Sequence, residues 1–390
     1  MKKFTGRVFL PLLVALLIVT AGCASAEIRA VRSGDIEALK EYVAEGGDVN
    51  APQNNGKTLL MFAAEAGQLQ SARYLLDNGA RIATRDNSGR SALMYAAAAG
   101  SSPLTELFIS RGAEVNTQES GGASALYLAS GNGKLQVVEI LLEAGADPSL
   151  RTSGRQTALF AAAEGNHTVV AQRLIDAGAD TAALDTAGRT PLIAAATANA
   201  AETAALLLER APETRDLRDN EGWSAVMRSL AASARSAKGL NSVAALLIER
   251  GALIDPEGSA ALKTAFAAAD SGNAEVMEVL LEAGFDPDTA GPDGTRLVIL
   301  STGKLPLLRS LLESGADPDG ADLRGHRALS EAVRLGQGEA ARLLIQFGAS
   351  TNRVGPDGRT LLMYAAAGSD LDLARQLLLG GASLRQRDNL

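Results

Sequence analysis

Residues 122–149 read GASALYLASGNGKLQVVEILLEAGADPS, and this stretch decides the fold. An Ala-rich segment is followed by a segment rich in Leu, Val and Ile, and both place apolar residues at the i, i+3, i+4 spacing of amphipathic helices. Gly145 follows the second segment, where a residue at positive φ commonly satisfies the last helical carbonyls. Pro148 then prevents the helix from resuming. A pair of short helices cannot bury its apolar faces alone, so the stretch predicts a unit that needs neighbours.

The same stop signal recurs along the chain at nearly constant spacing. One series of glycines has a period of 33 residues and comprises Gly46, Gly79, Gly112, Gly145 and Gly178. A second series has spacings of 33, 31, 33 and 33 residues and comprises Gly251, Gly284, Gly315, Gly348 and Gly381. A fixed period of this length is typical of arrays built from one repeated structural unit.

Short sequence motifs recur in register with these glycines: TALFAAA at Thr157–Ala163, TPLIAAA at Thr190–Ala196 and LLEAGADP at Leu141–Pro148. Because of these motifs and the 33-residue period, the chain resembles the ankyrin-repeat family over residues 27–390. The resemblance implies an all-α solenoid of about ten to eleven helix–turn–helix units with short β-hairpin or loop tips. It also implies that a hydroxyl residue begins the first helix of most units, where it can cap free N–H groups.

The pattern is irregular around residues 211–258. Ala211 occupies a position where the period calls for glycine, so we expect a turn of another shape there. Forty residues separate Ala211 from Gly251, and the seven extra residues predict an inserted loop near 231–241. If the array has a joint, we expect it in this region.

Composition limits the classes of partner. The 390 residues carry a net charge of −8, which disfavours nucleic acid as the main partner because phosphate binding needs a basic surface. Aromatic residues make up only 4% of the chain, which suits thin layers of closely packed helices.

The N-terminus has the layout of a secretory signal. Residues 1–22 contain basic residues, an apolar run too short to span a bilayer, and Ala21-Gly22 directly before Cys23, the only cysteine. This arrangement resembles the bacterial lipobox, which implies a signal peptide over 1–22, lipidation of Cys23, a short linker over 23–26 and a protein anchored in the envelope. An outer-membrane location facing the periplasm is then favoured over the inner membrane. Secretion with cleavage after Ala24 or Ala26, and an uncleaved anchor, stay open as alternatives.

No arrangement of residues predicts catalysis, a metal or a cofactor. Ser224 lies in a partial G-x-S-x-G motif but occupies the helix-capping position of its repeat. Residues 301–304, STGK, lack the remainder of a phosphate-binding loop and are interpreted as a turn. His167 and His326 are too far apart to suggest a shared site, and both are expected to be solvated.

An acidic cluster over residues 286–322 could offer oxygen ligands to a hard cation such as Ca²⁺. Its spacing is not that of an EF-hand loop, and the Asp of the GADP sequence is an ordinary position of the family. We therefore expect no metal site, no cofactor and no small-molecule substrate.

The resemblance implies that a protein partner is held by the tips and by the first helices. The residue after each hairpin glycine, here called the tip position, is basic in many units. The candidate partner contacts at tip positions are Lys57, Arg90, Arg155, Arg189, Trp223, His326 and Arg359. A row of cations would suit an acidic partner; alternatively, positions facing water simply carry long polar side chains. Trp223, the only tryptophan, could contact a partner or pack under the inserted loop.

Two functions follow from this reasoning. The first is a non-catalytic scaffold on the periplasmic side of a bacterial envelope, which binds a protein through its concave face and tips. The second is a periplasmic immunity or inhibitor protein that covers the active cleft of a toxin or enzyme. The fold alone does not choose between them.

Overall fold

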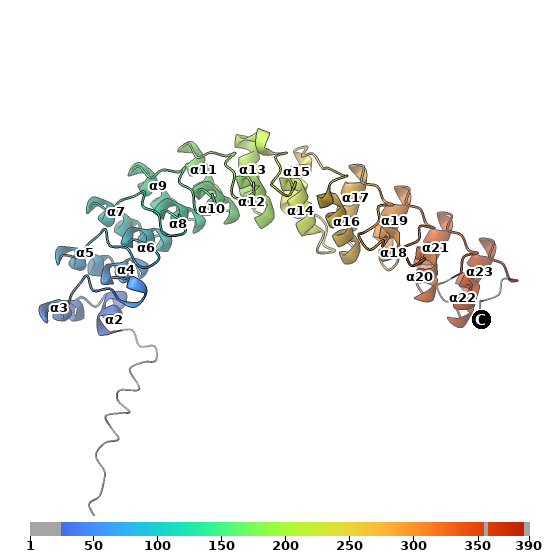
Figure 1. Cartoon of the computed structure of the whole chain (residues 1–390), viewed down its shortest axis with the longest axis horizontal. Helices are drawn as coiled ribbons and strands as arrows, with labels where there is room; N and C mark the ends of the chain where they lie inside the picture. Colours follow the sequence, from blue (N-terminus) through green and yellow to red (C-terminus); the bar gives the residue numbers. More distant parts are fainter. Residues whose placement is uncertain (1–24, 355–357, 386–390) are drawn as a thin grey trace, which may run out of the picture. The chain divides into compact units, whose positions relative to one another are not determined.

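The computed structural model describes residues 25–354 and 358–385 of the chain. Within these residues the regular structure is helical, without a strand, and the α-helices follow one another as eleven consecutive pairs (Figure 1). The predicted all-α class and the predicted number of helix–turn–helix units are confirmed. The predicted signal peptide and Cys23 lie outside the described residues.

The first helices of the pairs differ in length more than the second helices do. They are α2 (Ala26–Ser33), α4 (Leu59–Glu65), α6 (Ala92–Ala99), α8 (Ala125–Gly131), α10 (Ala158–Glu164), α12 (Pro191–Ala198), α14 (Ala225–Ser233), α16 (Ser259–Ser271), α18 (Leu297–Leu300), α20 (Ala328–Arg334) and α22 (Leu361–Ala367). The second helices are α3 (Ile36–Ala44), α5 (Leu69–Asp77), α7 (Ser102–Ser110), α9 (Leu135–Glu143), α11 (Thr168–Asp176), α13 (Ala201–Arg210), α15 (Ser242–Glu249), α17 (Ala274–Glu282), α19 (Leu305–Glu313), α21 (Gly338–Gln346) and α23 (Leu371–Leu379). Two 3₁₀ turns, η1 (Asn54–Gly56) and η2 (Pro212–Thr214), lie between pairs.

The chain forms two compact bodies. The first comprises the described residues up to 162 together with 169–180, and the second comprises 163–168 and the described residues from 181 onward. In the first body α2, α4, α6 and α8 pack side by side in chain order, and so do α3, α5, α7 and α9. In the second body α12, α14, α16, α18, α20 and α22 form the corresponding row. The irregular region 211–258 lies entirely within the second body, and its role as a joint stays a prediction.

The stop glycines adopt the backbone conformation that the sequence predicts. All ten have φ between 72° and 95°, and most have open space where a Cβ would stand, as at Gly145 with φ 83°. Glycine therefore recurs at these positions because the backbone needs a positive φ there, and not because a larger side chain would clash with its neighbours. Ala211 has φ −145° and is followed directly by η2, so the expectation of a different turn is confirmed.

Most of the predicted capping hydroxyls form the expected hydrogen bond. The side chains of Ser91, Ser124, Thr190, Ser224 and Thr360 each accept a hydrogen bond from the backbone N–H three residues later. The hydroxyl of Thr58 makes no such cap. That of Thr157 is buried without a hydrogen-bond partner in the described part of the chain.

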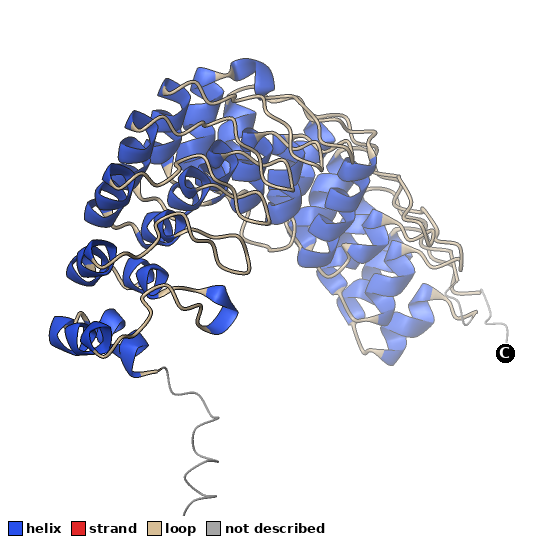
Figure 2. Cartoon of the chain, turned by 60° about the vertical axis from the view of Figure 1, so that its left-hand side comes forward, coloured by secondary structure: helices blue, strands red, loops and turns tan. Residues whose placement is uncertain are grey.

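The loops that precede the first helices form the tips, and Figure 2 shows the long loops in tan beside the blue helices. In several tips a single antiparallel bridge closes the loop, for example between Arg85 and Ser91 and between Arg218 and Ser224. Backbone hydrogen bonds also connect neighbouring tips. In the first body the N–H of Asn87 donates to the carbonyl of Asn55, and in the second body the N–H of Asn220 donates to that of Ala187, both across 2.9 Å.

Candidate interaction surface

Two tip cations of the first body, Lys57 and Arg90, are engaged by acids of the same body. Lys57 Nζ lies 2.9 Å from Glu65 Oε1, and it also lies 4.2 Å from the centre of the Tyr95 ring. Arg90 Nε donates to a carboxylate oxygen of Glu119 from the next tip. These two side chains are therefore held by their own repeats, and their charges are balanced before any partner arrives.

Two tip residues of the second body are engaged in the same way. Arg189 Nε donates to Asp185 Oδ2 across 2.8 Å, and its Nη2 lies 3.5 Å from Glu164 Oε1. His326 Nδ1 lies 2.8 Å from Asp322 Oδ2 while 36% of its side chain is exposed, so the histidine that was expected to be solvated is also paired with an acid of its own tip. Burial opposes ionisation of Asp322, but the hydrogen bonds from His326 and nearby backbone N–H groups hold the pKa of this carboxyl below its ordinary value.

The remaining tip cations are exposed. Arg155 has φ 61°, a conformation that a non-glycine residue adopts only at some cost, and its side chain faces solvent. Arg359 is likewise exposed. Partner contact by the tip residues stays a prediction, but the pairings at Lys57, Arg90, Arg189 and His326 show that they do not form a row of free cations.

An aspartate four residues before the tip position organises several tips, which sequence reasoning did not recognise. In each case Oδ1 accepts two backbone N–H groups of the loop, as Asp86 does from Ser88 and Arg90, both across 2.9 Å. The same pair of bonds is made by Asp185, Asp219 and Asp322. The recurring words DNSGR, DTAGR, DNEGW and DLRGH carry the signal that could have revealed this role.

Trp223 is buried rather than displayed at its tip. Only 7% of the residue is exposed, and its indole Nε1 is buried without a hydrogen-bond partner in the described residues. The guanidinium of Arg228 lies 4.9 Å from the ring centre, and Lys263 Nζ lies 5.9 Å from it. The ring is therefore buried at this tip beside Arg228 and Lys263, and contact of Trp223 with a partner stays a prediction.

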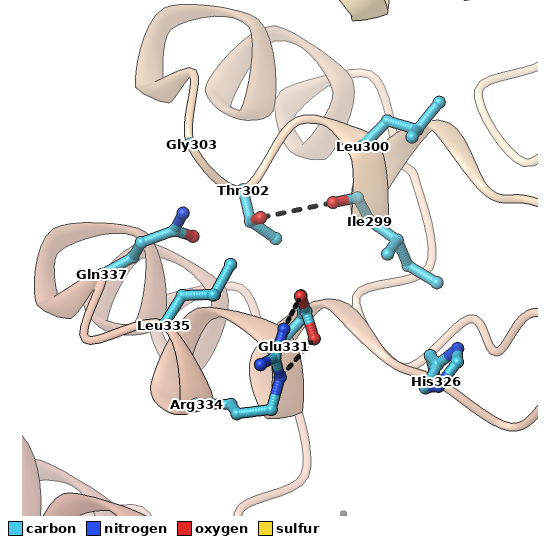
Figure 3. A pocket seen from close by; sticks show the side chains of 9 residues that line it. All are labelled: Ile299, Leu300, Thr302, Gly303, His326, Glu331, Arg334, Leu335 and Gln337. Atoms are coloured by element: carbon cyan, nitrogen blue, oxygen red, sulfur yellow. Dashed lines mark hydrogen bonds and ion pairs between the residues drawn. The ribbon is translucent and has the colours of Figure 1, made fainter. Parts of the chain in front are cut away.

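An open groove lies on the row of first helices in the second body, between α18 and α20. Its volume is about 690 Å³, and Figure 3 shows the side chains around it. It is lined by Ile299, Leu300, Thr302, Gly303, His326, Glu331, Arg334, Leu335 and Gln337. Leu335 is 49% exposed, and the charged rim is an ion pair in which Arg334 Nε donates to Glu331 Oε2 across 3.0 Å.

The groove arises because the repeat that contains α18 is shorter than its neighbours. α18 has four residues whereas α20 has seven, a difference of about 4.5 Å of helix at 1.5 Å per residue. On the side that faces α18, the last turn of α20 and the following Leu335 therefore extend beyond the neighbouring helix. The sequence showed the shortening as the 31-residue spacing between Gly284 and Gly315, but it did not show that an apolar groove results.

Comparison with known proteins agrees with this geometry. The chain matches the family model for ankyrin repeats in three copies, over residues 28–119, 126–216 and 297–388, which is more than half of its length. The chain belongs to the ankyrin-repeat family. Ankyrin repeats generally mediate protein–protein interaction, so the expected kind of partner is a protein.

Among solved structures, the chain is similar to the crystal structure of the human ASB11 ankyrin repeat domain. The two share 26% sequence identity with a TM-score of 0.52, and the match covers 58% of this chain and 98% of the other. A search of curated proteins finds no match. The three family matches leave out residues 217–296, which contain Trp223, the inserted loop and the long helix α16.

The residues considered for catalysis serve the ankyrin architecture. Ser224 Oγ accepts a hydrogen bond from the backbone N–H of Met227, as the capping interpretation predicts. Residues 301–304 form the turn between α18 and α19, and Lys304 Nζ is directed to backbone carbonyls, including that of Ala269. Both side chains have structural roles.

The acidic cluster joins successive repeats. Asp288 Oδ1 accepts the backbone N–H of Asp317, and Asp319 Oδ1 accepts that of Ser350, both across 2.9 Å. Asp286 and Asp317 each accept a backbone N–H two residues later in their own loops. Over residues 25–354 and 358–385, no group of three or more His, Cys, Asp or Glu side chains could hold a metal ion. In the same part of the chain, no helix combines the length and apolar character needed to cross a membrane.

Proposed function

We propose that this chain is a non-catalytic binding scaffold, anchored by lipid at Cys23 to a bacterial membrane and facing the periplasm. The proposal extends the general role of ankyrin repeats to a particular location and a particular surface. The support for the location is the sequence of residues 1–23, with its basic start, short apolar run and single cysteine after Ala-Gly. An outer-membrane position is the more favoured one.

The groove between α18 and α20 is the observation that carries the binding role. An apolar floor next to a polar rim is the arrangement that accepts one large apolar side chain of a partner and satisfies the polar groups around it. Ile299, Leu300 and Leu335 supply the floor, and the Glu331–Arg334 pair supplies the rim. We infer that a partner protein inserts an apolar anchor here and extends along the first helices.

The pairing of the tip cations bears on the inhibitor hypothesis. A row of cations at the tips would fit an acidic cleft on an enzyme or toxin, but Lys57, Arg90 and Arg189 are each paired with an acid of the chain itself. An exposed ion pair contributes little further attraction to a distant acidic surface because its charges cancel. The scaffold is therefore the better supported of the two functions.

The location is tested by the substitution Cys23→Ser in the native host. Loss of the protein from the membrane fraction, with its appearance in soluble periplasmic extract, is the expected result. Retention in the membrane after this substitution would contradict the lipid anchor. Palmitate labelling of the wild-type chain, absent from the variant, gives an independent reading of the same point.

A further inference from the structure

The inserted loop of the second body is held in one conformation by the helix pair that follows it. Residues 234–241 connect α14 to α15, and Asn273, only 1% exposed, reaches back to them. Its Nδ2 donates to the carbonyls of Ser233, Ser236 and Gly239, at 3.0, 2.7 and 3.1 Å. An amide held by this many partners in a buried site fixes the backbone that it contacts.

Further contacts from the same following pair complete this support. Ser271 Oγ donates to the carbonyl of Ala234 across 2.7 Å, and the backbone N–H of Leu240 donates to Glu275 Oε2 across 3.0 Å. Asn273 Oδ1 also accepts the N–H of Val276 and so caps α17. The insertion is therefore built into the packing of two helix pairs.

The charge of this region differs from that of the chain as a whole. Residues 222–248 contain no Asp or Glu, although the chain has 45 such residues in 390. Arg235 and Lys238 project from the loop and are exposed, and neither forms an ion pair in the part of the chain that the structure describes. Glu275 is engaged with the loop backbone.

The loop is separate from the tip surface. It begins after the C-terminal end of α14, and the tip lies before the N-terminal end, so nine residues of helix, about 13 Å, separate the two. A partner held at the tips would leave this loop accessible.

We propose that residues 234–240 are a second docking site, which binds an acidic segment of a protein partner. Carboxylates pair with Arg and Lys through charge-assisted hydrogen bonds, and complementary charge raises the rate and selectivity of association. Because Asn273 already fixes the backbone, Arg235 and Lys238 are presented without the entropic cost of ordering a flexible loop. The sequence around them contributes no acid, and Glu275, the acid of the following pair that contacts the loop, accepts the backbone N–H of Leu240.

The test uses the purified full chain and a fluorescein-labelled peptide of alternating Glu and Ala. Fluorescence anisotropy at low salt measures binding, and the double variant Arg235→Glu/Lys238→Glu is compared with the matched control Arg73→Glu/Arg81→Glu, which changes the net charge equally at exposed residues of the first body. We expect at least a tenfold rise in Kd for the insert variant and less than a twofold rise for the control. Equal losses in both variants would overturn the proposal, because they would indicate attraction by net charge alone.

Two further measurements localise the binding. Carbodiimide coupling should join the peptide to Lys238, as peptide mapping would detect, and coupling spread evenly over all exposed lysines would contradict a defined site. Asn273→Ala keeps both cations but releases the loop, so the Kd should rise several-fold while far-UV circular dichroism is unchanged. A loss in the insert variant seen with phosphatidylglycerol vesicles and not with the peptide would assign the loop to a lipid surface and overturn the proposal.

Discussion

The guanidinium of Arg228 donates from Nε to Oδ2 of Asp219 across 2.9 Å, and Asp219 has a side chain only 1% exposed. Tyr95 stands in the same relation to Asp86, nine residues earlier, with its hydroxyl 2.6 Å from Oδ2. In these two tips a residue of the first helix satisfies the buried carboxylate. The residue at the tip position then does not need to pair with this aspartate and can be apolar, as the buried Trp223 shows.

In two other tips, Arg189 and His326 satisfy the aspartate carboxylate from the tip position itself. Each lies four residues after its aspartate and approaches the Oδ2 oxygen at 2.8 Å. The helix position nine residues after the aspartate is then Ala194 or Glu331, neither of which can donate. The basic character of these tip residues is therefore explained by the fold, without a partner.

Removing Arg228 should destabilise the second body. In Arg228→Ala, Asp219 keeps its backbone donors but loses its charged partner, which should cost about 1–3 kcal/mol of unfolding free energy. Urea unfolding followed by the fluorescence of Trp223, the only tryptophan, reports the change locally. Arg309→Ala, which breaks an exposed pair 3.8 Å from Glu313, is the control and should change stability by less than about 0.5 kcal/mol. Equal midpoints for both variants would contradict this account.

The pairing at Asp322 predicts how its tip responds to acid. The folded-state pKa of Asp322 is lowered, so its contribution to stability is complete above the ordinary value of 3.8 and is lost as the pH falls through the lowered pKa. In His326→Ala the carboxyl should titrate closer to its ordinary pKa, and acid unfolding of the second body should begin at higher pH. Carboxyl carbon NMR shifts measured from pH 2 to 6 check this, and an unchanged titration of Asp322 would refute the role of His326.

Ala211 provides a test of the backbone argument. Since φ is −145° there, Ala211→Gly should destabilise the chain by about 0.5–1 kcal/mol, because glycine adds freedom to the unfolded chain and gains nothing in the native turn. Gly145→Ala should destabilise by about 1 kcal/mol for the opposite reason, because φ is 83° and a Cβ is disfavoured there. Thermal unfolding measures the destabilisation of each variant. A stabilising Ala211→Gly would show that this turn follows the ordinary repeat.

The repeat architecture was predictable because its signals are local. Glycine at positive φ, proline after a helix and a capping hydroxyl each act within a few residues, as at Gly145, Pro148 and Ser124. Because the period is constant, the same local signals recur in many units and each occurrence supports the others. Even the irregular turn at Ala211 and the insertion before α15 follow from departures from that period.

The surface was less predictable because it depends on contacts between repeats. The exposure of a tip residue is decided by which neighbouring acid reaches it, as Glu119 reaches Arg90 from 29 positions away. The sequence left open whether Trp223 contacts a partner or packs under the inserted loop, and the structure buries it beside Arg228 and Lys263. To predict the groove beside Leu335, one would have to know that the shorter spacing between Gly284 and Gly315 shortens α18 rather than the preceding loop.

Substitution of Leu335 separates binding from folding. The side chain is 49% exposed, so Leu335→Asp should change the free energy of unfolding by less than about 0.5 kcal/mol. Placing a charge on the apolar floor of the groove should weaken capture of the partner at least tenfold. Leu379→Asp, at a leucine that is 79% exposed and remote from the groove, is the matched control and should leave capture unchanged.

The binding role is tested most directly by photo-crosslinking in the native host. A benzoylphenylalanine introduced at position 335 should form a covalent adduct with one defined protein, identified by mass spectrometry, and the same group at position 379 should not. Recovery of that adduct from the membrane fraction would agree with an anchored scaffold. The absence of any protein adduct specific to position 335, at expression equal to the wild type, would contradict the account.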